Sequence, residues 1–268
     1  MNPYLRLYRP INNIMASIAV IAGAFIASGT GIIHVWEKVL IAAAVVFLFT
    51  GGGNALNDYV DREIDRKNHP ERPIPSGKIA PERALHLGLI SLFLPILLGF
   101  FINIESLIII IIAEALMLSY EFRYKKKGLL GNVEISIMVG MLFLFGGASA
   151  GNMERTAIFS IMATLATLGR EIVKDIEDME GDVDRITLPK RIGRERAGIV
   201  AAGAFMAAVS LSSIPFRDFG LIYLIIVSLA DIFFFYTSYL AMVDARKSQK
   251  MAKLSMLIGL LAFLAGAL

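Results

Sequence analysis

Residues 54–77 read NALNDYVDREIDRKNHPERPIPSG and follow directly on the apolar run VLIAAAVVFLFTGG at 39–52. The apolar run has the composition of a membrane helix, whereas the stretch after it contains Asp58, Asp61 and Asp65. Carboxylates at the end of such a helix are costly unless they reach water or bind a cation. The fold and the chemistry of the chain therefore depend on what these three aspartates bind.

The chain as a whole is far more apolar than a soluble domain of its size. Of 268 residues, 56% are hydrophobic and 18% are charged, and the mean hydropathy is +0.67. This composition predicts an all-α protein that crosses the membrane several times. The chain has no cysteine, which excludes disulfides and thiolate metal sites. The apolar run at 10–29 shows no small-residue cleavage site, so we interpret it as a helix and not as a removed signal peptide.

Apolar windows of about 18 to 23 residues match a bilayer core of roughly 30 Å. The number of such windows predicts a polytopic bundle of nine transmembrane helices. A bundle of eight is the alternative, because the last window, LSMLIGLLAFLAGAL, is short. The windows lie at 10–29, 39–57, 84–103, 105–122, 131–151, 156–174, 196–214, 219–241 and 252–268.

The distribution of positive charge predicts the orientation of the bundle. With a cytoplasmic N-terminus, 23 of the 26 lysines and arginines fall on the cytoplasmic side. The opposite side keeps Lys38, Arg155 and Arg217. We therefore predict a multi-pass protein of the cell membrane with its N-terminus and long loops in the cytoplasm. The basic face suits anionic headgroups or phosphorylated substrates, and no nucleic-acid partner is expected. No oligomeric state is predicted.

The aspartate triplet occurs a second time in the chain. On a helix, positions three, four and seven apart are neighbours on one face, so each triplet is predicted to form an acidic stripe. Both triplets follow even-numbered predicted helices on the same side, as in a duplicated unit whose stripes face each other across a central cavity. The triplets, spaced by three and then four residues, are Asp58, Asp61 and Asp65 in NDYVDREID, and Asp175, Asp178 and Asp182 in KDIEDMEGD.

Neighbouring residues complete the two stripes. Asn57 joins the edge of the first stripe, and Lys174 takes the corresponding place in the second. Glu63 and Glu180 lie on the far sides of their predicted helices and are left out of the site. We predict a single domain over residues 1–268, with a pseudo-repeated aspartate motif at 57–65 and 174–182.

Six carboxylates facing one another would repel unless cations lay between them. Mg²⁺ fits, because it binds a few carboxylates and completes its shell with substrate phosphate oxygens. The alternative is a pair of solvated helix ends held by salt bridges such as Asp58 with Arg62, and Asp61 with Arg62 or Arg66. The repetition of one register on one side favours Mg²⁺ as cofactor.

A cation held between carboxylates and a diphosphate neutralises that leaving group. If the diphosphate is attached to an allylic carbon, an apolar membrane chamber would protect the resulting cation from water. Basic residues after each stripe are candidates to close over the phosphates. These predicted substrate-binding residues are Arg62, Arg66, Arg72 and Lys78 after the first stripe, with Lys174 in the second.

These residues match a known pattern. NDYVDREIDRKNHPERPIPSGKI resembles the N-D-x-x-D-x-x-x-D motif and cap loop of the UbiA superfamily of intramembrane prenyltransferases, and KDIEDMEGD resembles its second motif. SYEFRYKKKGLLGN, at 119–132, looks like the segment between the family's fourth and fifth helices. The resemblance implies nine helices around a central cavity with cytoplasmic cap loops, and Mg²⁺-dependent transfer of a prenyl group to an acceptor that enters from the membrane.

Carried over residue by residue, the resemblance implies a role for each motif position. Asp61, Asp178 and Lys174 are predicted to be catalytic, with Lys174 contacting the diphosphate. The predicted metal ligands are Asn57, Asp58, Asp61 and Asp65 for one cation, and Asp175, Asp178 and Asp182 for the other.

The stretch LGREIVKDIEDMEGD looks most like the archaeal, lipid-forming branch of the family. This resemblance implies a geranylgeranyl transfer from geranylgeranyl diphosphate to the free hydroxyl of 3-O-geranylgeranylglyceryl phosphate, which makes the second ether bond of archaeal lipids. Arg170 stands where members with aromatic acceptors often carry tyrosine. Further cations and polar groups are predicted to bind the two substrates: Arg170, Lys125, Lys126, Arg9, Asn13 and Tyr120.

Two other functions stay open at this point. One is prenyl transfer to an aromatic acceptor, as in quinone or haem biosynthesis. The other is transport of a divalent cation, although both acidic clusters lie at one membrane surface, whereas transporter sites usually lie near the midplane. Glu114 and Asp231 lie inside apolar windows and match no motif, so we expect them to have hydrogen-bonded structural roles.

Overall fold

The computed structural model describes residues 2–125, 127–179 and 186–268. In this part of the chain the regular structure is helical, as the composition predicts. The helices are α1 (Pro3–Tyr8), α2 (Pro10–Ser28), η1 (Gly29–His34), α3 (Trp36–Val60), α4 (Arg62–Asn68), α5 (Pro81–Gly99), α6 (Ile104–Ser119), η2 (Tyr120–Tyr124), α7 (Leu129–Ser149), α8 (Glu154–Glu177), α9 (Leu188–Ile192), α10 (Arg194–Leu211), α11 (Phe216–Val243) and α12 (Ala245–Gly266).

Every predicted membrane window coincides with a helix. Within the described residues, seven helices are long and apolar enough to cross a membrane: α2, α3, α5, α7, α8, α11 and α12. Two others fall short of this measure. The helix α6 has 16 residues, and α10 has 18 and begins with Arg194, Glu195 and Arg196. A spanning helix needs about 20 apolar residues.

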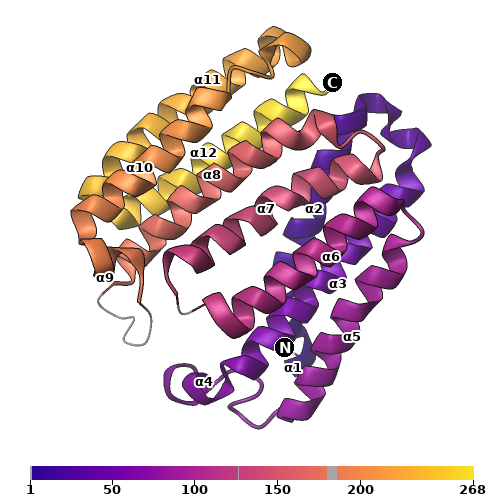
Figure 1. Ribbon diagram of the computed structural model, residues 1–268, viewed down its shortest axis with the longest axis vertical. Helices are drawn as coiled ribbons and strands as arrows, with labels where there is room; N and C mark the ends of the chain where they lie inside the picture. The colour runs from indigo at the N-terminus through magenta and orange to yellow at the C-terminus, as the bar shows by residue number, and fades with distance from the viewer. Residues whose placement is uncertain (1, 126, 180–185) are drawn as a thin grey trace.

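Neighbouring helices pack in sequence order around the bundle, from α2 through α12 (Figure 1). An additional contact crosses this ring, because α2 also packs along α7. The contact between α2 and α7 divides the bundle into two parts that share these two helices. One part also contains α3, α5 and α6, and the other also contains α8, α10, α11 and α12. Each part has its own cluster of buried apolar residues.

Glycines allow α2 and α7 to approach closely. A Cβ atom at Gly146 would lie 2.2 Å from the carbonyl oxygen of Val20, and one at Gly23 would lie 2.8 Å from that of Phe143. Larger residues at these positions would push the two backbones apart, which is why small residues are common at membrane helix contacts.

Both aspartate motifs lie at helix ends and not within continuous helices. The helix α3 ends at Val60, one residue before Asp61, and α8 ends at Glu177, one residue before Asp178. Each predicted stripe therefore continues past the end of a helix, at Asp61 and at Asp178. The local path nevertheless stays close to helical, because the backbone N–H of Asp61 donates to the Asn57 carbonyl at 2.9 Å.

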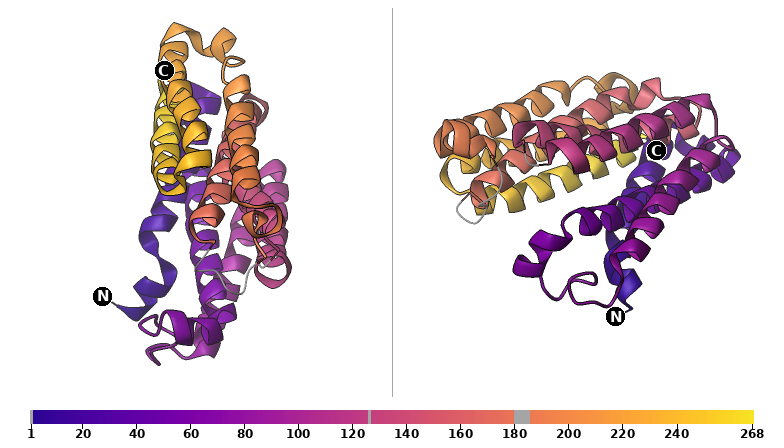
Figure 2. Two further views of the ribbon diagram at one scale, coloured as in Figure 1. Left: turned by 90° about the vertical axis from the view of Figure 1, so that its left-hand side faces the viewer. Right: turned by 60° about the horizontal axis from the view of Figure 1, so that its bottom comes forward.

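The segments that follow the two motifs share one end of the bundle. The N-terminus, α4 and α9 lie toward this end, and the C-terminus lies toward the other (Figures 1 and 2). The predicted arrangement, with both motifs at one surface, is therefore observed.

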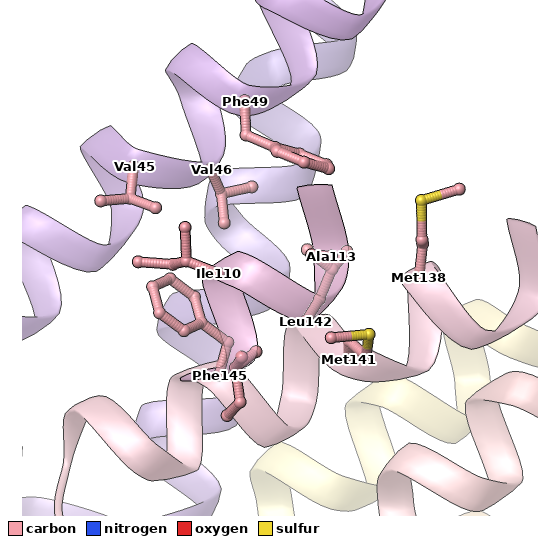
Figure 3. A pocket seen from close by; sticks show the side chains of 10 residues that line it. Val45, Val46, Phe49, Ile110, Ala113, Met138, Met141, Leu142 and Phe145 are labelled. Carbon is pink, nitrogen blue, oxygen red and sulfur yellow. The ribbon is translucent and has the colours of Figure 1, made fainter. Parts of the chain in front are cut away.

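The larger of two apolar cavities is the apolar chamber, with a volume of about 300 Å³, inside the part that contains α12. Its wall is built by α2, α7, α8, α10, α11 and α12. The smaller cavity, of about 40 Å³, lies between α3, α6 and α7 and is lined by residues such as Val46, Ile110 and Met141 (Figure 3). Of these two cavities, the apolar chamber is the one with room for a lipid chain.

An aromatic cluster closes the end of the apolar chamber that is far from the motifs. Phe143 and Phe263 line the chamber, and their rings lie 6.2 Å apart edge to face. Phe159 backs Phe263 at 4.6 Å and also contacts Tyr223 and Phe219. This cluster gives the chamber a rigid floor.

Candidate active site

A polar pocket lies between α7 and α8 at the motif end of the bundle. Polar side chains of η2, α7 and α8 face it, together with Lys125, which follows η2. On α7, Ile135 lines the polar pocket and Val139 lines the apolar chamber. These residues lie one turn apart on the same face of the helix, since residues four apart stack on a helix. The polar pocket therefore lies directly above the apolar chamber. Its lining comprises Tyr120, Lys125, Gly128, Gly131, Asn132, Ile135, Glu171, Lys174, Asp175 and Thr187.

Lys125 connects this pocket to the first aspartate motif. Its ammonium lies 2.6 Å from an Asp61 carboxylate oxygen and 2.9 Å from Glu121 Oε2. The other oxygen of Glu121 accepts a hydrogen bond of 2.9 Å from the Asn57 side chain. Glu121 and Lys125 are both buried. Asn57 and Asp61 thus face the pocket through a network in which one lysine is shared by two carboxylates.

A π-helical turn positions this network. The turn η2, Tyr120–Tyr124, follows α6 without a break and widens the helix at the motif end. Such turns are rare and occur frequently at functional sites. The altered spacing brings Tyr120 and Lys125 to the polar pocket, while Glu121 faces Asn57.

Asp58 and Asp65 pair with two arginines. Asp58 is 2% exposed and lies 2.5 Å from Arg9 Nη2. Arg72 binds Asp65 at 2.5 Å and lies 3.7 Å from Asp58. The cap loop is therefore held on the first motif by Arg72, and α1 is held there by Arg9.

Arg9 adopts an unusual backbone conformation. Its φ of 50° lies in the left-handed region and makes it the hinge between α1 and α2. Its guanidinium also donates to Asn54 at 3.3 Å. Asn13 is fully buried and bonds to the Tyr8 carbonyl and to Asn54. Arg9 and Asn13 thus brace the hinge, and they are not among the residues that line the polar pocket.

The second motif is organised by α7 and by acidic neighbours on α8. Asp175 is buried and accepts a hydrogen bond of 2.8 Å from Asn132. Asp178 is exposed at the end of α8. Glu171 pairs with Arg170 at 2.5 Å and with Lys174 at 3.5 Å. This arrangement directs Lys174 and Asp175 to the polar pocket.

Two polar atoms near the pocket are buried without a hydrogen-bond partner among the described residues. They are Arg170 Nε and Thr187 Oγ1. Buried polar groups are normally paired, and an unpaired group often marks a place for a ligand or water. Thr187 lines the pocket itself.

Several predicted site residues lie outside this network. Arg62 donates to the Tyr59 carbonyl at 2.8 Å and stacks on the Tyr59 ring. Arg66 pairs with the exposed Glu63 at 2.9 Å, and Lys78 is exposed. Asp182 and Lys126 lie outside the described residues. Within the described residues, Arg62 and Arg66 pair with Glu63, so the alternative salt bridges with Asp58 and Asp61 are not formed.

Three site residues were missed by the sequence interpretation. Glu121 and Asn132 lie in the quoted segment SYEFRYKKKGLLGN, of which only the tyrosine and lysines were used. Glu171 lies one helical turn before Asp175, and this spacing could have identified it.

Asp231 lines the apolar chamber and accepts a hydrogen bond from Ser212 at 2.7 Å, which agrees with the expected structural role. Glu114 is buried, but its Oε1 atom has no partner among the described residues.

The oxygen donors of both motifs have the chemistry that Mg²⁺ prefers. In the described part of the chain, however, no three acidic or histidine side chains converge closely enough to hold a metal. In the first motif, Lys125 and Arg72 lie on the oxygens of Asp61 and Asp65. The oxygen donors of the two motifs nevertheless fit a divalent cation by their chemistry.

Comparison with known proteins shows the family of the chain. The UbiA prenyltransferase family matches residues 16–264, so the chain belongs to this family. A digeranylgeranylglyceryl phosphate synthase of Methanosphaera stadtmanae is 40% identical over the full length of both chains. A solved structure of a digeranylgeranylglyceryl phosphate synthase has a TM-score of 0.90 and 40% identity, covering 99% of this chain and 97% of that one.

A more distant structure shares the fold. A UbiA homologue from Archaeoglobus fulgidus, solved with DMAPP and Mg²⁺, has a TM-score of 0.70 and 16% identity, covering 98% of this chain and 99% of that one. At this identity the likeness concerns the fold alone.

Proposed function

We propose that this chain transfers the geranylgeranyl group of geranylgeranyl diphosphate to the free hydroxyl of 3-O-geranylgeranylglyceryl phosphate. The reaction breaks the bond between C1 of the donor and its diphosphate, and forms an ether bond between C1 and the acceptor oxygen. The hydroxyl proton is lost, and inorganic diphosphate leaves. The observation that carries this proposal is the polar pocket, lined by Lys125 and Lys174 together with Glu171 and Asp175, above a 300 Å³ apolar chamber, which suits a metal-bound diphosphate head and a hydrocarbon chain.

Mg²⁺ is the cofactor of this proposal, and it would neutralise the diphosphate as it leaves. Asn57, Asp61 and Asp65 would hold one cation, and Asp178 with Asp175 the other. Asp182, which lies outside the described residues, belongs to the second set by its spacing. Asp58 is assigned instead to bracing Arg9 and Arg72, because its carboxylate lies near two guanidinium groups, whereas Asp65 pairs with Arg72 alone.

Basic side chains around the polar pocket would bind the phosphates. Lys125 and Lys174 both line the pocket and are placed to contact the donor diphosphate. Arg170, one turn before Lys174, has an unpaired Nε atom and is our candidate for the acceptor phosphate. Because charge-assisted hydrogen bonds are stronger than neutral ones, these groups would orient both heads without further contacts.

The apolar chamber would receive a prenyl chain and exclude water. Its wall is almost wholly hydrocarbon, so the allylic cation left by diphosphate departure would be shielded from hydrolysis. The chamber also borders the bilayer between α2 and α12, since its lining residues Met15 and Leu257 are 63% and 54% exposed. A lipid acceptor would enter there.

The membrane arrangement belongs to the same proposal. We propose that α6 and α10 also span, giving nine crossings in a single domain of residues 1–268, because each is packed between neighbours that span. The N-terminus and both motif ends would lie in the cytoplasm, as the distribution of lysine and arginine predicts.

The proposal is tested with purified protein in lipid nanodiscs, geranylgeranyl diphosphate and Mg²⁺. One reaction receives 3-O-geranylgeranylglyceryl phosphate and another receives 4-hydroxybenzoate. We expect an ether product from the first acceptor alone, its loss on chelation with EDTA, and its return with added Mg²⁺. Prenylation of the aromatic acid alone would replace the lipid assignment. Mg²⁺ uptake into vesicles without any prenyl transfer would favour a transporter.

A further inference from the structure

Two charged side chains, Asp231 and Lys253, line the otherwise apolar chamber. Asp231 is occupied by its hydrogen bond with Ser212. Lys253 differs, because none of the described carboxylates pairs with it, whereas Lys247 on the same helix pairs with Asp244 at 3.2 Å. Lys253 is exposed, so its ammonium can reach water or an anion at the opening of the chamber.

The depth of Lys253 places it at the upper rim of the chamber. The end of α8 and the start of α12 are level, because Glu177 and Ala245 line one surface pocket. Lys253 lies eight residues into α12, about 12 Å along the axis, and Arg170 lies seven residues before the end of α8, about 10 Å along it. Since α8 and α12 pack together, the two cations occupy similar levels on neighbouring helices, although Lys253 lines the chamber and Arg170 does not.

Lys253 also lies at the side of the chamber that borders the bilayer. It is one helical turn before Leu257, which lines the chamber and is 54% exposed. Across the opening on α2, Met15 also lines the chamber and is 63% exposed. If a lipid entered between α2 and α12, its headgroup would come close to Lys253. The headgroup would stay at the membrane interface while the hydrocarbon chain entered the apolar interior.

We propose that Lys253 binds the phosphate of the lipid acceptor as it enters the chamber, opposite Arg170. This inference rests on the proposed function and adds a residue that no motif contains. The acceptor has one hydrocarbon chain and one terminal phosphate, which matches an apolar wall with a single cation at its rim. The long lysine side chain can keep its methylenes on the wall while the ammonium reaches the phosphate. A charge-assisted hydrogen bond supplies the affinity.

The test compares Lys253→Met with Lys250→Met in nanodiscs of uncharged lipid. Lys250 is exposed on the same helix, one turn earlier, and does not line the chamber. We expect Lys253→Met to raise the KM for 3-O-geranylgeranylglyceryl phosphate about tenfold, as for loss of one charged hydrogen bond. The KM for geranylgeranyl diphosphate should be unchanged. Lys253→Arg should restore acceptor binding, and Lys250→Met should resemble the wild type.

A second acceptor separates phosphate recognition from a general effect of the substitution. With 3-O-geranylgeranylglycerol, which lacks the phosphate, wild type and Lys253→Met should have equal KM values. An unchanged KM for the phosphorylated acceptor, an equal rise for the diphosphate donor, or the same loss in Lys250→Met would overturn the inference while wild-type activity upheld the proposed function. Absence of ether product from the wild type would instead reject the function itself, and this inference with it.

Discussion

The ammonium of Lys125 lies 2.6 Å from Asp61, although the two residues are 64 positions apart, one directly after η2 and the other directly after α3. The same ammonium lies 2.9 Å from Glu121. A lysine between two carboxylates competes with a divalent cation for the same oxygens. Lys125 therefore has two opposing effects in the proposed reaction, since it weakens metal binding at Asp61 and supplies a cation to the diphosphate.

This relationship predicts opposite changes in two kinetic quantities for Lys125→Met. We expect kcat to fall on the order of a hundredfold, because a cation that stabilises the leaving group is lost. The Mg²⁺ concentration for half-maximal rate should decrease, because Asp61 and Glu121 lose their competing ammonium. Initial rates over a Mg²⁺ titration measure both quantities. Lys127→Met is the control, because Lys127 is exposed and lies over the Tyr124 ring at 4.9 Å. A higher Mg²⁺ requirement in Lys125→Met would contradict the idea of competition.

Substitution of Asp61 or Asp178 should lower activity, whereas substitution of Glu63 should not. We expect Asp61→Ala and Asp178→Ala each to lower kcat/KM on the order of a hundredfold, through loss of a metal ligand. Glu63→Ala should retain nearly full activity, because Glu63 is 62% exposed and pairs with Arg66 at the surface. Product formation at saturating Mg²⁺ measures all three, with thermal unfolding as a check of folding. Equal losses at the three positions would contradict the assignment of the motif faces.

The sequence predicted most of the architecture because membrane helices are defined by length and apolar composition. It predicted the positions of the helices and the clustering of the motifs at one end. It did not predict the contact between α2 and α7, which depends on where Gly23 and Gly146 meet after folding. The spacing of the aspartates also predicted that each helix continues through its motif. The helices α3 and α8 instead end one residue before Asp61 and Asp178.

Site residues were predicted where charge spacing repeats and were missed where pairing is tertiary. Asp61 and Lys174 are recognisable from the motifs themselves. Glu121 is not, because its importance comes from the π-helical turn that brings it between Asn57 and Lys125. Arg9 and Asn13 stay predicted substrate contacts, and the sequence did not indicate their partners within the chain, which are Asp58, Asn54 and the Tyr8 backbone.

Because α2 and α7 approach closely at Gly146, adding one methyl group there should lower the stability of the protein. We expect Gly146→Ala to lower stability by about 1–3 kcal/mol, because the new Cβ would lie 2.2 Å from a backbone oxygen that cannot move alone. Thermal unfolding in detergent measures the change. Gly203→Ala on α10 is the control, since no atom lies within 4 Å of its Cβ position. Higher helix propensity should there give a gain of up to about 1 kcal/mol. A Gly146→Ala protein as stable as the wild type would show that the helices separate at no cost.

The aromatic floor predicts how chain length is limited. Phe263 lines the end of the apolar chamber far from the motifs and is backed by Phe159 at 4.6 Å. Shortening it to leucine removes ring volume while keeping a hydrocarbon surface, so the chamber should become deeper without becoming wet. We expect Phe263→Leu to raise kcat/KM several-fold for a donor one isoprene unit longer than geranylgeranyl diphosphate, relative to geranylgeranyl diphosphate itself, since each added apolar group is worth about 1–3 kcal/mol in a fitting pocket.

Competition between the two donors, with products separated by mass, measures this ratio directly. Phe235→Leu serves as the matched control, because Phe235 is on α11 beside the chamber residue Phe234 but is 58% exposed and does not line the chamber. Its donor preference should equal that of the wild type. If Phe263→Leu also left the ratio unchanged while folding normally, the prenyl chain would not reach the floor. The length limit would then have to lie nearer the polar pocket, where Val139 and Ala166 form the upper wall.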